Sequence, residues 1–390
     1  MKIGIVLSKV PGYSETFMVS KVKGLVASGY DVILFVNEGK KAKWHQALVI
    51  PAAKVNRFLI VKWFRVLFMS VFLCVFYFRT TSAYWKLLRE AGVSVSGGLR
   101  NLYINSHILT HRLDWLHFGF ATMALERELV ARVLGAKMSV SFRGYDINVY
   151  PLKHPGCYQK LWSEVNKVHS ISKDLFHSAV VQGLCPSIDF AIINPAINLE
   201  LFTPAITGGK NGTPLQLLTV ARLTWIKGLE YAIAATHLLK GQGVKINYNI
   251  VGDGDLYERL MFAIHQYSVE DCVHLLGPKK PEEIIALMHN CDIYLQTSLQ
   301  EGFCNAVVEA QASGCLCIVS DTGGLRENVA DEETGWLVPK RNPEALATKI
   351  LHVMALKPEQ KQWVRTAAIK RVKQNFDLAV QVERFVKFFS

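Results

Sequence analysis

A segment with two glutamates separated by seven residues carries the side chains best suited to chemistry. It reads Glu301-Gly302-Phe303-Cys304-Asn305-Ala306-Val307-Val308-Glu309. Apolar runs over 292–299 and 315–319 flank it, so the order strand, glycine loop, helix, strand indicates a parallel α/β sheet. Ligands bind such sheets at the carboxyl ends of strands, where Glu301 is expected, and a carboxylate accepts paired hydrogen bonds from vicinal sugar hydroxyls. For an isolated pair, two solvated helix charges would be the alternative.

A second cluster contains two cations at a turn between a strand and a helix. Residues 215–220 read as a strand, Arg222 and Lys227 follow, and a helix is expected over 229–239. Two cations beside the free backbone amides of a helix N-terminus form a site for a diphosphate. The alternative is a pair of surface cations, which the neighbouring glutamate segment disfavours.

A longer pattern of residues resembles the donor site of family 4 glycosyltransferases. It consists of Ser298, Glu301-Gly302-Phe303, Glu309-Ala310, Gly314, Gly323-Gly324 and Gly335 to Pro339. The resemblance covers nearly the whole chain and is most specific over 220–339. Two further segments are similar to the colanic-acid-type subgroup, which builds bacterial exopolysaccharides. They are Gly12-Tyr13-Ser14-Glu15-Thr16-Phe17 near the N-terminus and the sequence over 301–311.

The resemblance implies a role for each donor-side residue. Glu301 would contact the transferred sugar, Glu309 would hold the ribose, and Arg222 and Lys227 would neutralise the leaving diphosphate. The remaining donor contacts would come from the loops that contain Gly302, Phe303, Cys304, Asn305, Gly252 and Gly277. Cys304 departs from the family, where a small residue is common, and its larger side chain could alter which sugar fits. Gly252 has an equal alternative as a simple turn residue.

The acceptor side is expected near Arg143 and Asp146, at the end of a strand over 138–142. Many family members have a histidine where Arg143 stands. A guanidinium cannot act as a base, so Arg143 is expected to bind a phosphate or to steady developing charge. Asp146 would orient Arg143 or the acceptor hydroxyl, or would cap the next segment. Gly12, Ser14 and Glu15 fall on the first loop between a strand and a helix, at the same expected edge.

The length and the alternation of elements predict two domains. The chain has 390 residues, with strands expected at 32–36, 115–118, 138–142, 168–171, 191–193 and 246–251, and a helix at 122–134. We predict an acceptor domain over 1–197, a linker over 198–214, a donor domain over 215–375, and a terminal helix over 376–390 that packs back on the first domain. The resemblance implies the GT-B fold, in which two Rossmann-like doubly wound parallel-sheet domains face a cleft.

Positive charge is concentrated in the first half of the chain. Residues 1–200 hold a net charge of +12, and ten Lys or Arg but no acid lie between Glu38 and Glu90. The same region contains an apolar run over 66–78, too short to span a bilayer. Either a helix lying on anionic lipid through residues 54–89 or a buried helix of the first domain would explain that run, and the charge could also serve a phosphorylated acceptor. Nucleic acid is disfavoured because no recognised binding module occurs.

The cysteines and histidines give no metal pattern. The eight cysteines have no ligand spacing, and His107, His111 and His117 lack the helical register of a metal site. The chain begins without a secretion signal or a disulfide pattern, which indicates a reducing compartment. We therefore expect no metal and no tightly bound cofactor.

The sequence predicts a retaining glycosyltransferase of class EC 2.4. The expected donor is a nucleotide-diphosphate sugar, and the expected acceptor is a lipid-diphosphate-linked glycan of a cell-surface polysaccharide. The expected location is the cytoplasm, peripheral at the inner face of the cytoplasmic membrane. Alternatives are an epimerase or a phosphorylase of the same fold, or a non-catalytic pseudo-transferase that binds nucleotide-sugar or glycan. A phosphorylase would carry pyridoxal phosphate, visible in an absorbance spectrum, and intact glutamate and cation pairs argue against a pseudo-transferase.

Overall fold

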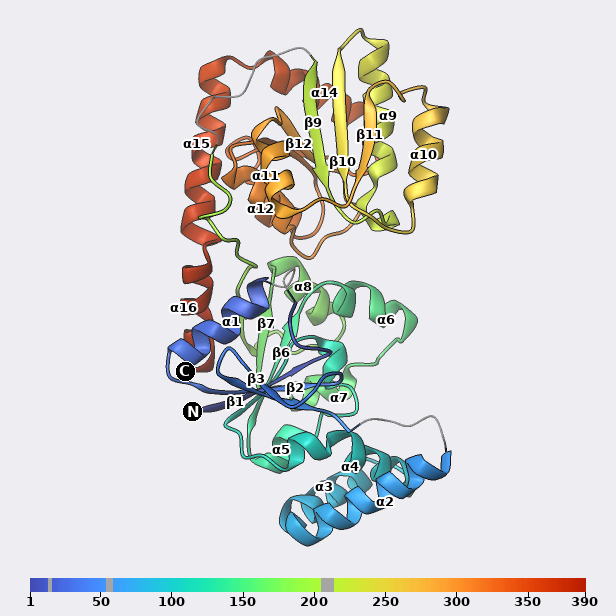
Figure 1. Ribbon diagram of the computed structural model, residues 1–390, viewed down its shortest axis with the longest axis vertical. Helices are drawn as coiled ribbons and strands as arrows, with labels where there is room; N and C mark the ends of the chain where they lie inside the picture. The colour runs from blue at the N-terminus through green and yellow to red at the C-terminus, as the bar shows by residue number, and fades with distance from the viewer. Residues whose placement is uncertain (13–15, 54–58, 205–213) are drawn as a thin grey trace. The chain divides into compact units, whose positions relative to one another are not determined.

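The computed structural model describes residues 1–12, 16–53, 59–204 and 214–390. The chain divides into two compact units, each built around its own sheet (Figure 1). Unit 1 comprises Met1–Ile193 and Val382–Ser390, and unit 2 comprises Asn194–Gln381. Ser14 and Glu15 lie outside the described residues.

The sheet of unit 1 has eight strands in the order β3-β4-β2-β1-β5-β6-β7-β8. The strands are β1 (Lys2–Leu7), β2 (Asp31–Val36), β3 (Ala42–Trp44), β4 (Ala47–Pro51), β5 (Trp115–Phe118), β6 (Lys137–Phe142), β7 (Lys167–Ser170) and β8 (Asp189–Ile192). All neighbours pair in parallel except β3 and β4. Nearly continuous apolar runs such as that of β1 suit a sheet covered on both faces.

The helices of unit 1 connect these strands. They are α1 (Thr16–Ala27), α2 (Leu59–Phe76), α3 (Phe78–Glu90), α4 (Val95–Leu109), η1 (Ala121–Ala124), α5 (Val130–Leu134), η2 (Tyr145–Val149), α6 (Tyr150–Lys153), α7 (Gln159–Glu164) and α8 (Lys173–Val181). The single helix predicted over 122–134 is wrong. Leu125 is extended and Glu126 has a φ of 65°, so the helix is broken into η1 and α5.

The sheet of unit 2 has six parallel strands in the order β11-β10-β9-β12-β13-β14. They are β9 (Leu215–Val220), β10 (Ile246–Val251), β11 (Val273–Gly277), β12 (Ile293–Gln296), β13 (Leu316–Ser320) and β14 (Trp336–Val338). The chain builds outward from β9 to β11, then returns to the other side of β9 to place β12. The pair β9 and β12 is therefore the point where the strand order reverses.

The helices of unit 2 lie between and after its strands in the sequence. They are η3 (Trp225–Lys227), α9 (Leu229–Gly241), α10 (Tyr257–Gln266), α11 (Pro281–His289), α12 (Asn305–Ala312), α13 (Leu325–Asn328), α14 (Pro343–Ala355) and α15 (Pro358–Asn375). Prolines open three of them, at a position where the missing N–H leaves no hydrogen bond unmade.

The final helix, α16 (Leu378–Phe389), supplies core side chains to unit 1. Phe385, Phe388 and Phe389 are buried in one cluster with side chains of β1, β2 and α1. Gly24 of α1 leaves room for Val382, because a Cβ at Gly24 would lie 2.4 Å from a Val382 methyl group.

The apolar run over 66–78 falls in α2 and at the start of α3, which lie beside α4 (Figure 1). Over the part of α2 whose side chains are described, 63–76, only a narrow stripe is buried, so the alternative of a buried core helix is wrong. Within the described residues no single helix is long and apolar enough to cross a membrane. Trp63–Phe76 and Phe78–Glu90 meet that test only as a pair, and they are bent by 120°.

Candidate functional site

The donor-side residues gather at the point of unit 2 where the strand order reverses. Arg222 and Lys227 follow β9, and Glu301 follows the neighbouring β12. In open parallel sheets the connections at such a point diverge and leave a crevice at the carboxyl edge, where ligands bind. Residues 74 or more positions apart in the sequence thus share one edge of one sheet.

Lys227 and Glu301 form an ion pair at this edge, with the lysine ammonium donating to Glu301 Oε1. Both side chains are nearly buried, at 11% and 12% exposure. Burial opposes the charge of Lys227, but Glu301 outweighs it and raises the lysine's pKa above its usual value. The nearby Arg222 partly opposes that rise, while its own guanidinium is exposed. The site therefore holds two cations, Arg222 and Lys227, and one carboxylate, which forms the ion pair with Lys227.

A buried chain of polar side chains fixes the orientation of Glu301. Ser298 donates to Glu301 Oε1 at 2.8 Å, and Gln296 donates to Ser298 Oγ at 2.8 Å. Tyr294 donates to Gln296 Oε1 at 3.2 Å and lies against the backbone of Val220 in β9. Three side chains of β12 and its loop thus connect the carboxylate to the sheet, and only Ser298 among them belonged to the sequence pattern.

Glu309 lies on the fifth residue of α12, half-buried, and no side-chain partner is found for it among the described residues. Desolvation raises its pKa from 4.5 to about 7. A desolvated carboxylate without a hydrogen-bond partner lowers the folding stability of the free protein. That cost is offset when a ligand offers hydroxyl groups.

The backbone of the Glu301 loop is held from two sides. Asn328 accepts from the Cys304 N–H and donates to the Cys304 carbonyl, both at 3.0 Å. A Cβ on Gly324 would lie 2.0 Å from the Gly302 carbonyl oxygen, so only glycine permits this approach. The Gly324 N–H also donates to the Glu301 carbonyl at 2.8 Å. Sequence reasoning missed Asn328, because nothing near it in the sequence indicates a contact with Cys304.

The turn after β9 is positioned by an equally close contact. Gly228 has a φ of 56°, and a Cβ there would lie 2.5 Å from the Thr297 carbonyl oxygen. Gly252 lies close to the Ala221 carbonyl oxygen, and a Cβ there would lie 1.9 Å from that atom. This close approach, next to Arg222, explains why the position holds a glycine. Gly277 also has a positive φ, of 68°, and has open space where a Cβ would project.

The other predicted donor contacts surround the start of α12. Gly302 and Asn305 are half-buried, and Phe303 packs edge-on against Phe376 with ring centres 5.3 Å apart. Cys304 is buried, and burial raises the pKa of its thiol to about 12. Its thiol is therefore neutral and serves as packing under the loop rather than as a nucleophile.

Unit 1 places the predicted acceptor-side residues near its own reversal point, between β1 and β5. Gly12 follows β1 and is exposed. The Arg143 guanidinium lies over the Phe17 ring, 3.9 Å from its centre. Asp146 accepts from the backbone N–H groups of Arg143, Gly144 and Ala121 at 2.9 to 3.0 Å. Burial raises the pKa of Asp146 and these three bonds partly offset that rise, which is the arrangement of a backbone cap.

A buried polar network that the sequence did not reveal lies on the same sheet. His117 contacts Lys21 Nζ at 2.7 Å, Ser139 Oγ at 2.8 Å and Ser141 Oγ at 3.0 Å. Ser141 continues to His169 Nδ1 at 2.8 Å, and His169 Nε2 lies 2.9 Å from the Ile193 carbonyl. Burial lowers the pKa of Lys21 and of both histidines well below their usual values. Burial therefore favours the neutral forms of all three groups.

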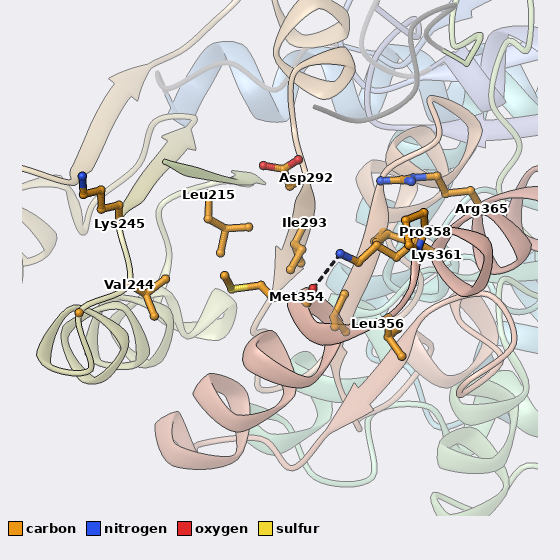
Figure 2. A pocket seen from close by; sticks show the side chains of 13 residues that line it. Leu215, Val244, Lys245, Asp292, Ile293, Met354, Leu356, Pro358, Lys361 and Arg365 are labelled. Atoms are coloured by element: carbon orange, nitrogen blue, oxygen red, sulfur yellow. Dashed lines mark hydrogen bonds between the residues drawn. The ribbon is translucent and has the colours of Figure 1, made fainter. Parts of the chain in front are cut away.

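A cavity of about 630 Å³ in unit 2 lies at the opposite edge of the sheet, at the amino ends of β9, β12 and β13. Three of its polar side chains, those of Lys361, Arg365 and Asp292, have hydrogen-bond partners within the protein. Lys361 donates to the Met354 carbonyl at 2.8 Å (Figure 2). Arg365 donates to the Gly314 carbonyl at 3.1 Å, and Asp292 accepts from the Gln216 N–H at 2.9 Å. Because these three groups are already engaged, we place the candidate site at the glutamate edge.

Metal ligands do not gather in the described part of the chain. No group of three or more His, Cys, Asp or Glu side chains lies close enough together there to hold a metal ion.

Comparison with known proteins gives one family and several close relatives. Residues 206–370 match the family described as Glycosyl transferases group 1. WcaL of Escherichia coli (strain K12), whose name assigns it to colanic acid biosynthesis as a glycosyltransferase, is 30% identical, with 97% of each chain covered. AmsK of Erwinia amylovora, named as an amylovoran biosynthesis glycosyltransferase, is 30% identical, with 90% of each chain covered.

A third relative matches a shorter part of the chain. It is the N,N'-diacetylbacillosaminyl-diphospho-undecaprenol alpha-1,3-N-acetylgalactosaminyltransferase of Campylobacter jejuni, 28% identical with 44% of each chain covered.

Solved structures of the same fold cover almost the entire chain. Sucrose-phosphate synthase from Thermosynechococcus elongatus matches with a TM-score of 0.74 and 16% identity, over 100% of this chain and 98% of that one. HepE from Anabaena in complex with UDP-glucose matches with a TM-score of 0.71 and 15% identity, over 99% and 98%. These matches confirm the GT-B fold class, with two Rossmann-like parallel-sheet domains.

Proposed function

The chain belongs to the group 1 glycosyltransferases, and on that premise we propose that it transfers a sugar from a nucleotide-diphosphate sugar to a surface polysaccharide with retention of anomeric configuration. The products named for WcaL and AmsK, two polysaccharides of the bacterial surface, support this pathway class. The complex of HepE with UDP-glucose supports the donor class.

One observation carries the proposal: the Lys227–Glu301 pair beside the exposed Arg222, at the reversal point of a parallel sheet. Cations bind the oxygens of a diphosphate, whereas a carboxylate accepts from sugar hydroxyls. A donor whose diphosphate meets Lys227 and Arg222 brings its sugar to Glu301. Glu309, in the helix that follows, offers a free carboxylate to the ribose at the other end of the same molecule.

The proposed reaction breaks the bond between the sugar's anomeric carbon and the β-phosphate oxygen. The electron pair leaves with the diphosphate, whose growing charge Arg222 and Lys227 neutralise, and Glu301 steadies the oxocarbenium-like sugar. The acceptor hydroxyl then bonds to the same face of the anomeric carbon. Its proton passes to the released phosphate oxygen, so the step requires no protein base.

The proposed acceptor is a glycan linked to a lipid diphosphate at the inner face of the cytoplasmic membrane. The net charge of +12 over residues 1–200 and the Arg143 guanidinium at the reversal point of unit 1 suit a phosphorylated acceptor. The name of the Campylobacter jejuni relative describes transfer to such a lipid diphosphate. Arg143 would contact phosphate in this scheme.

The decisive experiment is a panel of nucleotide-sugars that differ in base and in sugar, scored by thermal stabilisation of the full chain. We expect one donor to raise the unfolding temperature more than its free nucleotide does, and the same donor to support transfer to a lipid-linked glycan. If no nucleotide or nucleotide-sugar in the panel changes the unfolding temperature, the donor assignment fails.

We further propose that the diphosphate is neutralised without a divalent metal, because Arg222 and Lys227 supply two positive charges at the required position. Transfer measured in excess chelator should then equal transfer in its absence. A loss of activity that only added Mg²⁺ or Mn²⁺ restores would contradict this mechanism.

A further inference from the structure

Helix α2 exposes an apolar surface that water does not favour. The buried side chains of its described part, Val66, Ser70 and Leu73, follow a single stripe against α4. Most of the remaining surface is apolar and exposed: Trp63, Phe64, Leu67, Phe68, Val71, Phe72, Val75 and Phe76, continued by Phe78 at the start of α3. We call these nine side chains the apolar face. A helix that is apolar on all sides belongs in a protein core or a membrane.

The extent of exposure separates this face from ordinary scattered surface residues. Phe64 is 70% exposed, Phe68 66% and Phe76 69%, all on one helix of 18 residues. Soluble monomers rarely expose a contiguous apolar patch larger than a few hundred Å², on the order of 300–600 Å². A patch of this kind marks an interaction surface.

The positive charges around the apolar face favour an anionic partner. Arg65 and Arg79 are exposed near its two ends, and Lys86 and Arg89 are exposed farther along α3. The sequence has no acid between Glu38 and Glu90. Long basic side chains beside an apolar surface reach lipid headgroups while their stems stay in the acyl boundary. A second copy of the same face would instead bring like charges together.

The helix geometry decides how lipid would be contacted. The 120° bend between the two helices and the attachment of α2 to α4 prevent α2 from standing upright in a bilayer. We propose that α2 and the start of α3 lie in the plane of an anionic membrane and insert the apolar face into one leaflet, with Arg65 and Arg79 among the headgroups. The surface belongs to unit 1 and the donor cluster to unit 2, so the two proposals can fail separately.

Flotation of the full chain with vesicles tests the proposal. We expect binding to vesicles of phosphatidylglycerol and phosphatidylcholine at low salt, weaker binding at high salt because the Debye length shortens, and little binding to pure phosphatidylcholine. The triple variant F64S/F68S/F76S should bind at least tenfold more weakly, as should R65Q/R79Q in anionic vesicles. The matched control is Phe262→Ser on α10, which removes a phenylalanine of 65% exposure from unit 2 and should leave binding unchanged.

Quenching by brominated phosphatidylglycerol tests insertion rather than surface contact. Trp63 lies on the apolar face, and Trp363 is an exposed tryptophan of unit 2. Fluorescence quenching should fall in Trp63→Phe and persist in Trp363→Phe. Equal vesicle binding by the triple variant and the native chain would overturn the proposal, as would the absence of any vesicle binding. Self-association that the triple variant abolishes, without lipid binding, would assign the face to a second copy and overturn it too. Calorimetry with nucleotide reports separately on the donor site.

Discussion

At the residue scale, the two glutamates of the donor cluster have different environments. Glu301 is ion-paired and held by Ser298, whereas Glu309 is half-buried with its hydrogen-bonding capacity unused among the described residues. The raised pKa of Glu309, about 7, means that the folded free protein favours its protonated form. Its contribution to stability is therefore fully present below about pH 4.5 and is lost as the pH rises through about 7.

Glu309→Gln should stabilise the free protein at pH 8 and weaken nucleotide binding. Stability should rise by on the order of 2 kcal/mol because a buried charge is removed, while loss of a charged hydrogen bond to ribose should cost about 1–3 kcal/mol of binding. Thermal unfolding and calorimetry measure the two effects. Asp292→Asn is the control: its carboxyl also has a raised pKa, but at the opposite sheet edge, so nucleotide affinity should not change. Unchanged nucleotide affinity in Glu309→Gln would exclude the ribose role.

Lys227→Ala and Arg222→Ala should reduce kcat far more than they reduce folding stability. The charge that these cations meet grows as the diphosphate leaves, so a loss of 100-fold or more is expected, about 2.7 kcal/mol. Lys240→Ala removes a lysine that also pairs with an acid in unit 2, but at the exposed end of α9, and should leave turnover intact. Near-normal turnover of a folded Lys227 or Arg222 variant would contradict the phosphate assignment.

At the element scale, the site depends on loops that approach one another more closely than side chains allow. The loop after β12 contacts the turn after β9 at Gly228 and the loop after β13 at Gly324. These contacts explain why glycines recur around the glutamates: they set the distance between connections of neighbouring strands. The position of Glu301 is thus a property of three loops rather than of one.

Gly324→Ala should impair transfer by displacing the Glu301 loop. Its Cβ would lie 2.0 Å from the Gly302 carbonyl, so this backbone must move, and a displacement near the sugar is expected to lower kcat/KM at least 100-fold. Gly241→Ala is the control, because nothing lies within 4 Å of its Cβ. Circular dichroism should show both variants folded. Wild-type kcat/KM for Gly324→Ala would show that the contact is not required.

At the scale of the whole molecule, unit 1 contains a buried polar layer in which burial favours the neutral form of each basic group. His169 Nε2 donates to the Ile193 carbonyl, so its Nδ1 accepts from Ser141, and a single chain of hydrogen bonds continues to His117. Phe385 and Phe389 of α16 cover Lys21 at one end of this chain. Burial lowers the pKa of Lys21 and His117, so the folded state binds fewer protons than the unfolded chain. The free energy of unfolding therefore decreases as the pH falls.

Lys21→Met should stabilise unit 1 most at neutral pH. Burial lowers the pKa of Lys21 in the folded state below the value of about 10.5 in the unfolded chain, so protonation favours the unfolded chain and the amine lowers stability as the pH falls below about 10.5. The increase in unfolding temperature of Lys21→Met over the native chain should be largest at pH 7 and should shrink toward pH 10. A difference that does not depend on pH would mean that Lys21 is charged in the fold.

The sequence predicted the elements that depend on local residue patterns. The structure added the hydrogen bonds between residues that are far apart in the sequence. Strand boundaries such as those of β9 and β10 were correct because apolar runs between turns define them. Hydrogen-bond partners such as Gln296 and Asn328 were missed, since contacts between separate loops leave no local pattern. The helix predicted over 122–134 failed because the positive φ of Glu126 interrupts a continuous helical periodicity.

The apolar run over 66–78 shows a different limit of the sequence. Its composition suited both a core helix and a lipid-facing helix, because periodicity cannot tell a solvent face from a buried one when both are apolar. The exposure of Phe68 and Phe76 excludes the core helix, whereas contact with lipid stays a prediction. The roles given to Glu301 and Arg143 remain predictions that the experiments above address.

The contribution of α16 to unit 1 has a consequence for the order of events during translation. Phe385, Phe388 and Phe389 belong to the core of unit 1, yet a ribosome makes them after all of unit 2. Unit 1, although begun first, therefore still exposes the sheet surface around Lys21 and His169 until synthesis ends. Chaperones that hold nascent chains would meet that unfinished surface for most of synthesis, and a product truncated before residue 382 would display it permanently to proteases.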